Sequence, residues 1–191
     1  GLLNPQIGGP SVRPFQPPGL WAEVALTNAK FVQDKGDKNY RKSMYTYYKR
    51  SAPVPNMTTF DAPSREKCII ARSRTNTPLQ ALITLNDPIF VEAFRVFAER
   101  IILEGGKTVS EKIDFAFKNS ISRKPESDVR ELVAELYAKN LKDFKEDPNK
   151  SKALLAVGSR PANASLDASE LAAWTVIAQL VMNMDETLNK E

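Results

Sequence analysis

The chain has 191 residues, of which 42% are hydrophobic and 26% are charged, with a net charge of +4 and no histidine. This length fits one domain, or one domain with a small appendage. The missing histidine excludes Ser–His and Cys–His catalytic pairs, histidine metal sites and haem ligation by histidine within this chain. The positive charge is weak evidence for a polyanionic partner.

Further features of the sequence exclude particular kinds of site and segment. Cys68 is the single cysteine, so neither an intrachain disulfide nor a cysteine-rich zinc site can form. No stretch approaches the roughly 18 apolar residues that a membrane span needs. Because the chain begins at Gly1 rather than Met, we expect it to be a domain excised from a larger protein. The absence of a signal pattern then carries no information on where that protein resides.

Residues 1–76 hold most of the prolines and predict an irregular, turn-rich segment. Pro18 can open a short helix within it, whose apolar side would comprise Trp21, Val24 and Ala25. Residues 43–48 are rich in aromatic residues that favour a strand, although a helical turn is nearly as plausible there. Residues 68–71 form a second apolar run, which could pair with the first as a minor β-hairpin.

Residues 77–191 predict successive helices, several of which begin with a polar cap followed by proline. Thr77-Pro78 starts the first helix, and its apolar positions at helical spacing are Leu79, Leu82 and Ile83. Asp87-Pro88 starts the second helix in the same way. The predicted buried stripe of this second helix comprises Phe90, Phe94, Phe97 and Ile101.

The remaining helices have similar start signals. Thr108 and Glu111 form a capping box, Pro125 precedes a longer helix, and Asp147-Pro148 starts a short one. Asp167 caps the final helix, whose apolar face comprises Leu171, Trp174, Ile177, Val181, Met184 and Leu188. The sequence therefore predicts a mainly α fold, in which residues 77–191 form a bundle of five to six helices. We interpret residues 1–76 as packed on this bundle within a single domain.

Several short motifs occur in a characteristic order. They are IGGPSV at 7–12, YRKSMYTYYKR at 40–50, FDAPSRE at 60–66, RTNTPLQAL at 74–82 with LNDP at 85–88, and the closing stretch 174–191 with NMDE at 183–186. Together they resemble the planctomycete-type C-terminal domain of unknown function, family 1553 in the numbering of such domains. The resemblance covers nearly the whole chain.

This resemblance implies a large exported bacterial protein, in which a cytochrome-c-like domain and a second uncharacterised domain precede this one. It implies export to the periplasm or cell surface, a haem that is carried upstream rather than in this segment, and upstream domains of the same protein as partners. The family has no established catalytic residues to carry over. We expect this chain to hold only the last part of the family domain.

A stretch of basic and aromatic residues is the first candidate for a binding site. The basic residues are Arg41, Lys42, Lys49, Arg50, Arg65, Lys67, Arg72 and Arg74, and the aromatic ones are Tyr45, Tyr47 and Tyr48. Such a pattern can form a cationic surface with stacking platforms, as in proteins that bind single-stranded nucleic acid. Nucleic acid is disfavoured because charge is not otherwise concentrated, and an anionic glycan suits an exported protein better. The structural alternative is that the arginines pair with acids such as Asp61 and Glu66.

A second candidate site lies just before the predicted helix at Thr77. Arg72 and Arg74 could reinforce the free N–H groups of the helix N-terminus and bind a small anion or carboxylate. Plain helix capping by Thr77 is the structural alternative. The candidate ligand-binding residues of the two sites are Arg72, Arg74, Thr77, Arg50, Arg65, Tyr45 and Tyr47.

Two other groups have weaker functional interpretations. Asp61 and Glu66 could act as a carboxylate pair in acid–base chemistry, but beside Arg65 we expect them to be ionised and salt-bridged. Cys68 lies in an apolar run without histidine, which favours a buried structural thiol over a nucleophile.

Three functions stay open. The first is an interaction or structural module that docks on upstream domains, the second a glycan-binding or small-anion-binding domain that uses stretch 41–78, and the third an accessory part of a hydrolase or redox enzyme. We favour the first, and expect no activity in the isolated domain, because the sequence has no complete catalytic constellation. A docking module should expose an apolar patch. A binding domain should instead have a pocket of Arg and Tyr, and an enzyme fragment should have paired carboxylates in a cleft.

Overall fold

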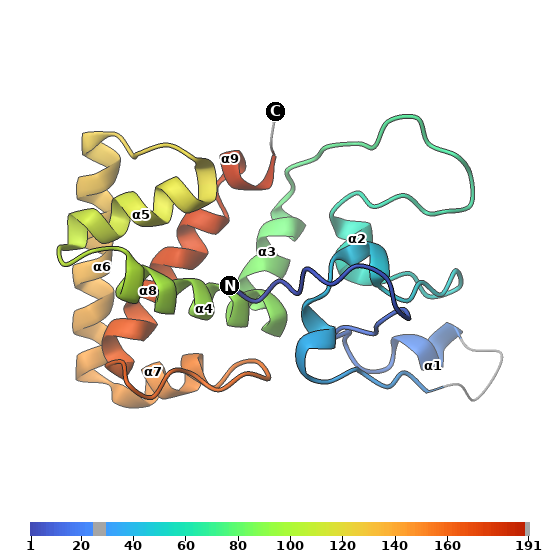
Figure 1. Ribbon diagram of the computed structural model, residues 1–191, viewed down its shortest axis with the longest axis horizontal. Helices are drawn as coiled ribbons and strands as arrows, with labels where there is room; N and C mark the ends of the chain where they lie inside the picture. The colour runs from blue at the N-terminus through green and yellow to red at the C-terminus, as the bar shows by residue number, and fades with distance from the viewer. Residues whose placement is uncertain (25–29, 190–191) are drawn as a thin grey trace. The chain divides into compact units, whose positions relative to one another are not determined.

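The computed structural model describes residues 1–24 and 30–189, which divide into two compact units (Figure 1). We call Leu2–Gln80 the N-terminal unit, and Gly1 together with Ala81–Glu191 the helical unit. Helix α3 (Pro78–Asn86) begins in the N-terminal unit and continues into the helical unit.

Over its described residues, the N-terminal unit contains short elements. These are helices α1 (Leu20–Val24) and α2 (Pro55–Thr59) and the 3₁₀ turns η1 (Gly36–Tyr40) and η2 (Ser43–Tyr45). Its buried apolar residues include Val12, Trp21 and Val54. The helix expected after Pro18 therefore forms from Leu20 and contains Trp21, whereas the Ala25 position lies outside the described residues.

The β-hairpin expected between residues 43–48 and 68–71 does not form. The described part of the chain has isolated β-bridges in place of named strands, and one of them joins Val12 to Thr46. The backbone N–H of Val12 donates to the Tyr45 carbonyl at 2.8 Å, so this edge of the first run is already paired. Residues 68–71 lie in an exposed irregular loop. The prediction was wrong because the composition of a run does not show which segment its backbone will pair with.

The helical unit consists of six longer or medium helices and a short last one. They are the rest of α3, then α4 (Pro88–Glu104), α5 (Val109–Ile121), α6 (Ser127–Glu146), α7 (Pro148–Leu155), α8 (Ala168–Met182) and α9 (Asp185–Leu188). The predicted caps are present: Asp87 accepts from the N–H of Ile89 at 2.8 Å, and Thr108 and Glu111 form both halves of a capping box. The mainly α fold predicted from the sequence is confirmed.

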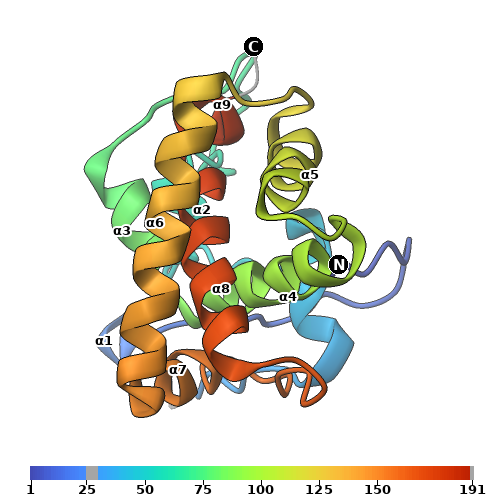
Figure 2. The ribbon, with the colours of Figure 1, turned by 90° about the vertical axis from the view of Figure 1, so that its left-hand side faces the viewer.

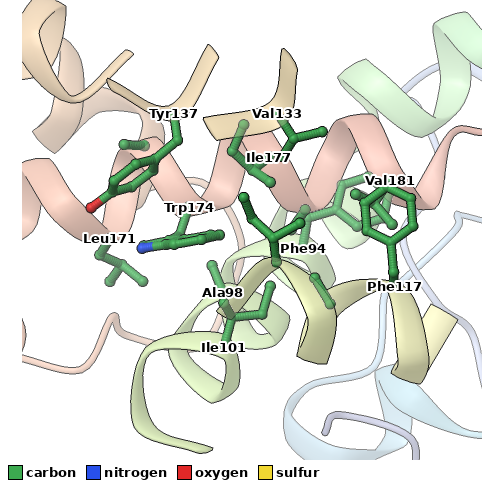
Figure 3. Packing of buried hydrophobic residues seen from close by; sticks show 14 residues of the cluster. Phe94, Ala98, Ile101, Phe117, Val133, Tyr137, Leu171, Trp174, Ile177 and Val181 are labelled. Atoms are coloured by element: carbon green, nitrogen blue, oxygen red, sulfur yellow. The ribbon is translucent and has the colours of Figure 1, made fainter. Parts of the chain in front are cut away.

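Helix α8 is the centre of the helical unit. It contacts α4, α5, α6 and α7, and Figure 2 shows it running behind α6. Its residues Leu171, Trp174, Ile177 and Val181 are each at most 1% exposed. Figure 3 shows Trp174 beside Tyr137 of α6, with the two ring centroids 4.5 Å apart. A helix that is buried on several sides in this way belongs inside a bundle.

Two predicted stripes differ in detail from the structure. On α4, Phe94 and Ile101 are buried in the core, whereas Phe90 and Phe97 are partly buried and pack against it. The last helix is shorter than predicted, because α8 ends at Met182 with Asn183 as its C-cap and α9 restarts at Asp185. Met184 therefore lies between two helices, a position that the apolar spacing alone does not reveal.

Candidate docking surface on helix α3

Helix α3 buries polar residues and exposes apolar ones. Gln80 and Thr84, one turn apart, are each 1% exposed. On another side of the same helix, Leu79, Leu82 and Leu85 are 55%, 57% and 42% exposed. A spacing of three residues places these leucines along one side of a helix. Of the apolar positions predicted at helical spacing, Leu79 and Leu82 are therefore exposed and Ile83 is partly buried. We call Leu79, Leu82 and Leu85 the leucine face.

The first buried polar residue, Gln80, is fully engaged in hydrogen bonds within the N-terminal unit. Its side-chain amide donates to the Thr59 carbonyl at 2.9 Å and to the Thr75 hydroxyl at 3.1 Å. Its side-chain oxygen accepts from the N–H of Thr77 at 3.1 Å, and its own N–H donates to the Thr77 hydroxyl at 3.3 Å. This reciprocal pair is a capping box with glutamine in the third helical position. It fixes which side of α3 faces inward.

The second buried polar residue, Thr84, is engaged within the helical unit. Its hydroxyl lies 2.9 Å from the side-chain oxygen of Asn183 and 2.9 Å from the Ala81 carbonyl. A buried hydroxyl without a partner would cost about 1–3 kcal/mol, so these bonds make the polar inward side tolerable. Each polar residue is thus bonded within its own unit, Gln80 in the N-terminal unit and Thr84 in the helical unit.

The leucine face is an exposed apolar patch of the kind that marks an interface. Full burial of a leucine contributes about 1.5–3 kcal/mol. Since roughly half of each leucine is still exposed, covering all three would contribute about 2–4 kcal/mol. Single exposed leucines are common on protein surfaces, but three on one short helix whose opposite residues are polar are not. The arrangement is suited to packing against another apolar surface.

Helix α4 carries a buried charged cluster that the sequence analysis missed. Glu92 and Arg95 are 2% and 1% exposed, and Glu99 is 9% exposed. The two oxygens of Glu92 accept from the N–H groups of Arg160 at 2.7 Å and Ser159 at 3.0 Å. Arg95 donates to Glu99 at 3.1 Å. The cluster therefore clamps the loop before α8, and both carboxylate oxygens of Glu92 are occupied by structural bonds.

The tyrosines of the Arg/Tyr stretch are used inside the N-terminal unit. A guanidinium lies over each ring, with Arg41 over Tyr45 at 3.8 Å, Arg13 over Tyr47 at 4.8 Å and Arg65 over Tyr48 at 4.9 Å. One face of each ring is thus already covered by a cation of the same unit. This is a cation–π arrangement, rather than the pairing of arginine with carboxylate that we expected as the structural alternative.

Arg41 shows how such an arginine organises the segment. Its guanidinium donates to the carbonyls of Pro10 and Gln6, both at 3.1 Å, and also to that of Gly8. The N–H of Gly8 in turn donates to the Tyr45 hydroxyl at 2.9 Å. Arg41 and Tyr45 therefore bind the glycine turn near the N-terminus, which otherwise has few backbone partners of its own.

The second candidate site is only partly assembled. Arg72 and Arg74 lie in an exposed loop, and Arg50 is exposed at a turn. The Thr77 hydroxyl and the N–H of Gln80, two of the donors expected for an anion, are bonded to each other. Pro78 has no N–H, so Leu79 carries the remaining N–H of the expected set. Binding of an anion by Arg72, Arg74 and Thr77 stays a prediction.

Asp61 and Glu66, the candidate carboxylate pair, have different surroundings. Asp61 accepts from the N–H of Thr75 at 2.9 Å and from the Thr75 hydroxyl at 2.7 Å. Glu66 is exposed, and neither acid takes part in the ion pairs found among the described residues. The salt bridges expected with Arg65 are therefore replaced by a side-chain clamp on the segment that leads into α3.

Cys68 is exposed, so the prediction of a buried thiol was wrong. It lies beside Ile69 and Ile70, which are 46% and 107% exposed, in the loop where the expected strand fails to form. Across the described ranges, no group of His, Cys, Asp and Glu side chains could hold a metal ion. Within the same ranges, no helix combines the length and apolar character that crossing a bilayer requires.

The fold and the site define a mainly α module with an exposed leucine face. The family model PSD1, described as "Protein of unknown function (DUF1553)", matches residues 1–137. The chain therefore belongs to this family, which confirms the resemblance of its motifs. The matched residues include α3 and the motifs before it, whereas the motif stretch 174–191 lies beyond them. Comparisons with curated proteins and with solved structures gave no match.

Proposed function

We propose that this chain is an interaction module that docks through the leucine face of α3 onto upstream domains of the same polypeptide. The observation that carries the proposal is the inverted burial of α3, with Gln80 and Thr84 inside and Leu82 outside. Because its inward side is made of hydrogen-bonded polar residues, α3 gains only part of the apolar burial that its leucines could contribute. A partner that covers the leucine face would provide the rest of this apolar burial.

The upstream part of the same protein is the occupant that the family context favours. The motifs resemble a domain that follows a cytochrome-c-like domain and a second uncharacterised domain in exported proteins. A domain tethered to its partner also docks at a high effective concentration, which adds to the contribution of the leucine face. The proposal therefore includes the exported setting and the upstream haem domain that the resemblance implies.

The other two functions have less support from the geometry. A glycan site on stretch 41–78 needs open aromatic faces, and one face of Tyr45 is covered by Arg41. An accessory catalytic role needs paired acids with free oxygens, and both oxygens of Glu92 are bonded to the backbone. Neither alternative has an observation in its favour that matches the leucine face.

Protection of a thiol on the leucine face tests the docking directly. Leu82→Cys would be made in a Cys68→Ser background, because Cys68 is itself exposed. The rate of maleimide labelling would be measured for the domain alone and after addition of the separately expressed upstream region. We expect labelling to slow by at least about tenfold if the docking free energy exceeds about 1.4 kcal/mol under the conditions used.

A matched control is available on α6. Leu132 is 56% exposed, close to the 57% of Leu82, and lies away from α3 in the sequence. Leu132→Cys in the same background should label at one rate with and without the upstream region. Equal rates at Leu82 in both conditions, with the upstream region shown to be folded, would contradict docking through α3.

A further inference from the structure

A shallow groove lies on the surface of the helical unit, apart from the leucine face. Its volume is about 580 Å³. Val109, the first residue of α5, lines it together with Ala134, Tyr137, Ala138, Leu141, Lys142, Lys145 and Glu146 of α6. Known sites for small molecules fall in a range of about 300–1,000 Å³ and are mostly apolar with a few placed polar groups. The groove has this size and this composition.

The lining changes character along α6. The residues from Ala134 to Leu141 are apolar apart from the Tyr137 hydroxyl, and the charged residues Lys142, Lys145 and Glu146 follow at one end. The rise of about 1.5 Å per residue places Lys145 about 16 Å from Ala134 along the helix. The groove is therefore long, apolar for most of its length and cationic at one end.

The charges at this end favour a single anionic group. Lys142 lies 3.8 Å from Glu146, so these two charges offset each other. Lys145 is exposed and lines the same end, which leaves the lining with one excess positive charge. An ammonium group attracts a carboxylate or a similar anion there, and the attraction weakens with salt because the site is exposed.

Tyr137 forms the floor of the groove and is 8% exposed. Burial, with the nearby Glu170 carboxylate, raises the pKa of its hydroxyl to about 12. The hydroxyl therefore stays neutral at physiological pH and adds no negative charge beneath a bound anion. Its ring packs on Trp174, which is fully buried, so the floor is held rigidly by the core.

We propose that this groove binds a linear amphiphile with one anionic head group, of the alkyl carboxylate class. The alkyl chain would lie along Ala134, Ala138 and Leu141 against Val109, with the head group at Lys145. The inference goes beyond docking through α3 and does not depend on it, because the two surfaces share no residue. The inference rests on complementarity. The groove is apolar with a cationic end, and such a ligand has an apolar chain with an anionic end.

Three probes of equal chain length separate the contribution of the alkyl chain from that of the head-group charge. Dodecanoate, dodecan-1-ol and dodecyltrimethylammonium would be titrated below micelle formation by calorimetry. Methyl resonances of Val109 and Leu141 would be followed by NMR, with Leu82 methyls as the internal control. We expect dodecanoate to bind most tightly, the alcohol more weakly and the cation least, with shifts at Val109 and Leu141.

Two pairs of variants make the assignment specific. Lys145→Gln should weaken dodecanoate binding about two- to fivefold, as the loss of one exposed charge contact would, whereas Lys139→Gln, at an exposed lysine of the same helix that does not line the groove, should not. Ala138→Trp should abolish binding by filling the groove, and Ala153→Trp on α7 should leave it unchanged. Ala138 and Ala153 are both exposed, so each variant should keep its fold, which circular dichroism would check.

Several outcomes would overturn the proposal. Equal binding of the cation and the carboxylate would mean that the groove selects no head group. Methyl shifts centred on Leu82 rather than Leu141 would place the amphiphile on the leucine face. Absence of dodecanoate binding up to its solubility limit would leave an apolar peptide as the alternative occupant. None of these results would affect thiol protection at Leu82, so failure of this inference is distinguishable from failure of the docking proposal.

Discussion

Helices α3 and α4 follow each other in the chain and begin with the same device, yet they differ in what they bury: α4 buries an apolar stripe together with a charged cluster, whereas α3 buries polar residues and exposes its leucines. Thr77-Pro78 starts α3 and Asp87-Pro88 starts α4. Helix α4 buries Phe94 in the core, whereas α3 buries Gln80 and exposes Leu82. A start signal thus determines where a helix begins, but not which of its sides finds a partner.

The two helices differ in whether their apolar residues are covered by the rest of the chain. The apolar residues of α4 meet those of α8 and are satisfied within the chain. The leucine face of α3 meets nothing comparable among the described residues, although its polar side is fully bonded. We therefore expect α4 to contribute mainly to stability and α3 mainly to interaction. Substitutions in each helix test these two roles.

The largest contrast should appear between Phe94 and Leu82. Phe94→Ala should lower the free energy of unfolding by about 3–5 kcal/mol, because it leaves a cavity beside α8. Leu82→Ala removes an exposed side chain and should change it by less than about 0.5 kcal/mol. Urea unfolding of the two variants and the wild type measures both values. Similar losses for the two variants would mean that Leu82 is packed as tightly as the core.

The buried charged cluster should be nearly as sensitive as the core. Glu92→Ala should cost about 3 kcal/mol, because it removes one of the two carboxylates beside Arg95 and leaves the buried backbone N–H groups of Ser159 and Arg160 without their acceptor. Glu104→Ala on the same helix removes an exposed partner of Arg100 and should cost far less, because solvent screens that pair. Urea unfolding at neutral pH compares the two. Equal costs would show that the clamp on the loop before α8 contributes no more than a surface ion pair.

A smaller effect is expected at acid pH. Although partial burial opposes it, hydrogen bonds from Arg130 and Lys124 hold the pKa of Asp114 below the ordinary value of 3.8. The stabilisation is therefore present above pH 3.8 and is lost as the pH falls through the lowered value. Exposed pairs of this kind contribute about 0.2–1 kcal/mol. Asp114→Asn should reduce stability at pH 7 by this amount and match the wild type near pH 2, as thermal melts at both pH values would show.

Helix starts could be predicted from sequence because a cap involves only neighbouring residues. Thr108 and Glu111, for example, bond to each other across one turn and need no tertiary partner. Burial of a given side depends on what lies opposite, so the helical spacing of Leu79 and Leu82 could not show that both are exposed. Glu92 and Arg95 could not be recognised either, because charged residues on a helix usually face solvent and their partner is a distant loop.

The Arg/Tyr stretch illustrates the same limit at the candidate site. Its composition indicated that arginines and tyrosines would act together, and Arg65 does lie over Tyr48. Composition could not say that the cation covers a ring of its own unit rather than leaving it open for a ligand. Cys68 was expected inside because Ile69 and Ile70 follow it, yet the loop carries all three outside.

The most direct test of the account is the affinity of the domain for its upstream region with and without the leucine face. Leu79→Gln, Leu82→Gln and Leu85→Gln together keep helix propensity while removing the apolar side. The matched control replaces three other exposed leucines by Gln, namely Leu103, Leu132 and Leu180. We predict that calorimetry will detect binding for the wild type and the control but not for the α3 variant, with all three proteins folded. Unchanged binding by the α3 variant would contradict the central claim that α3 is the docking surface.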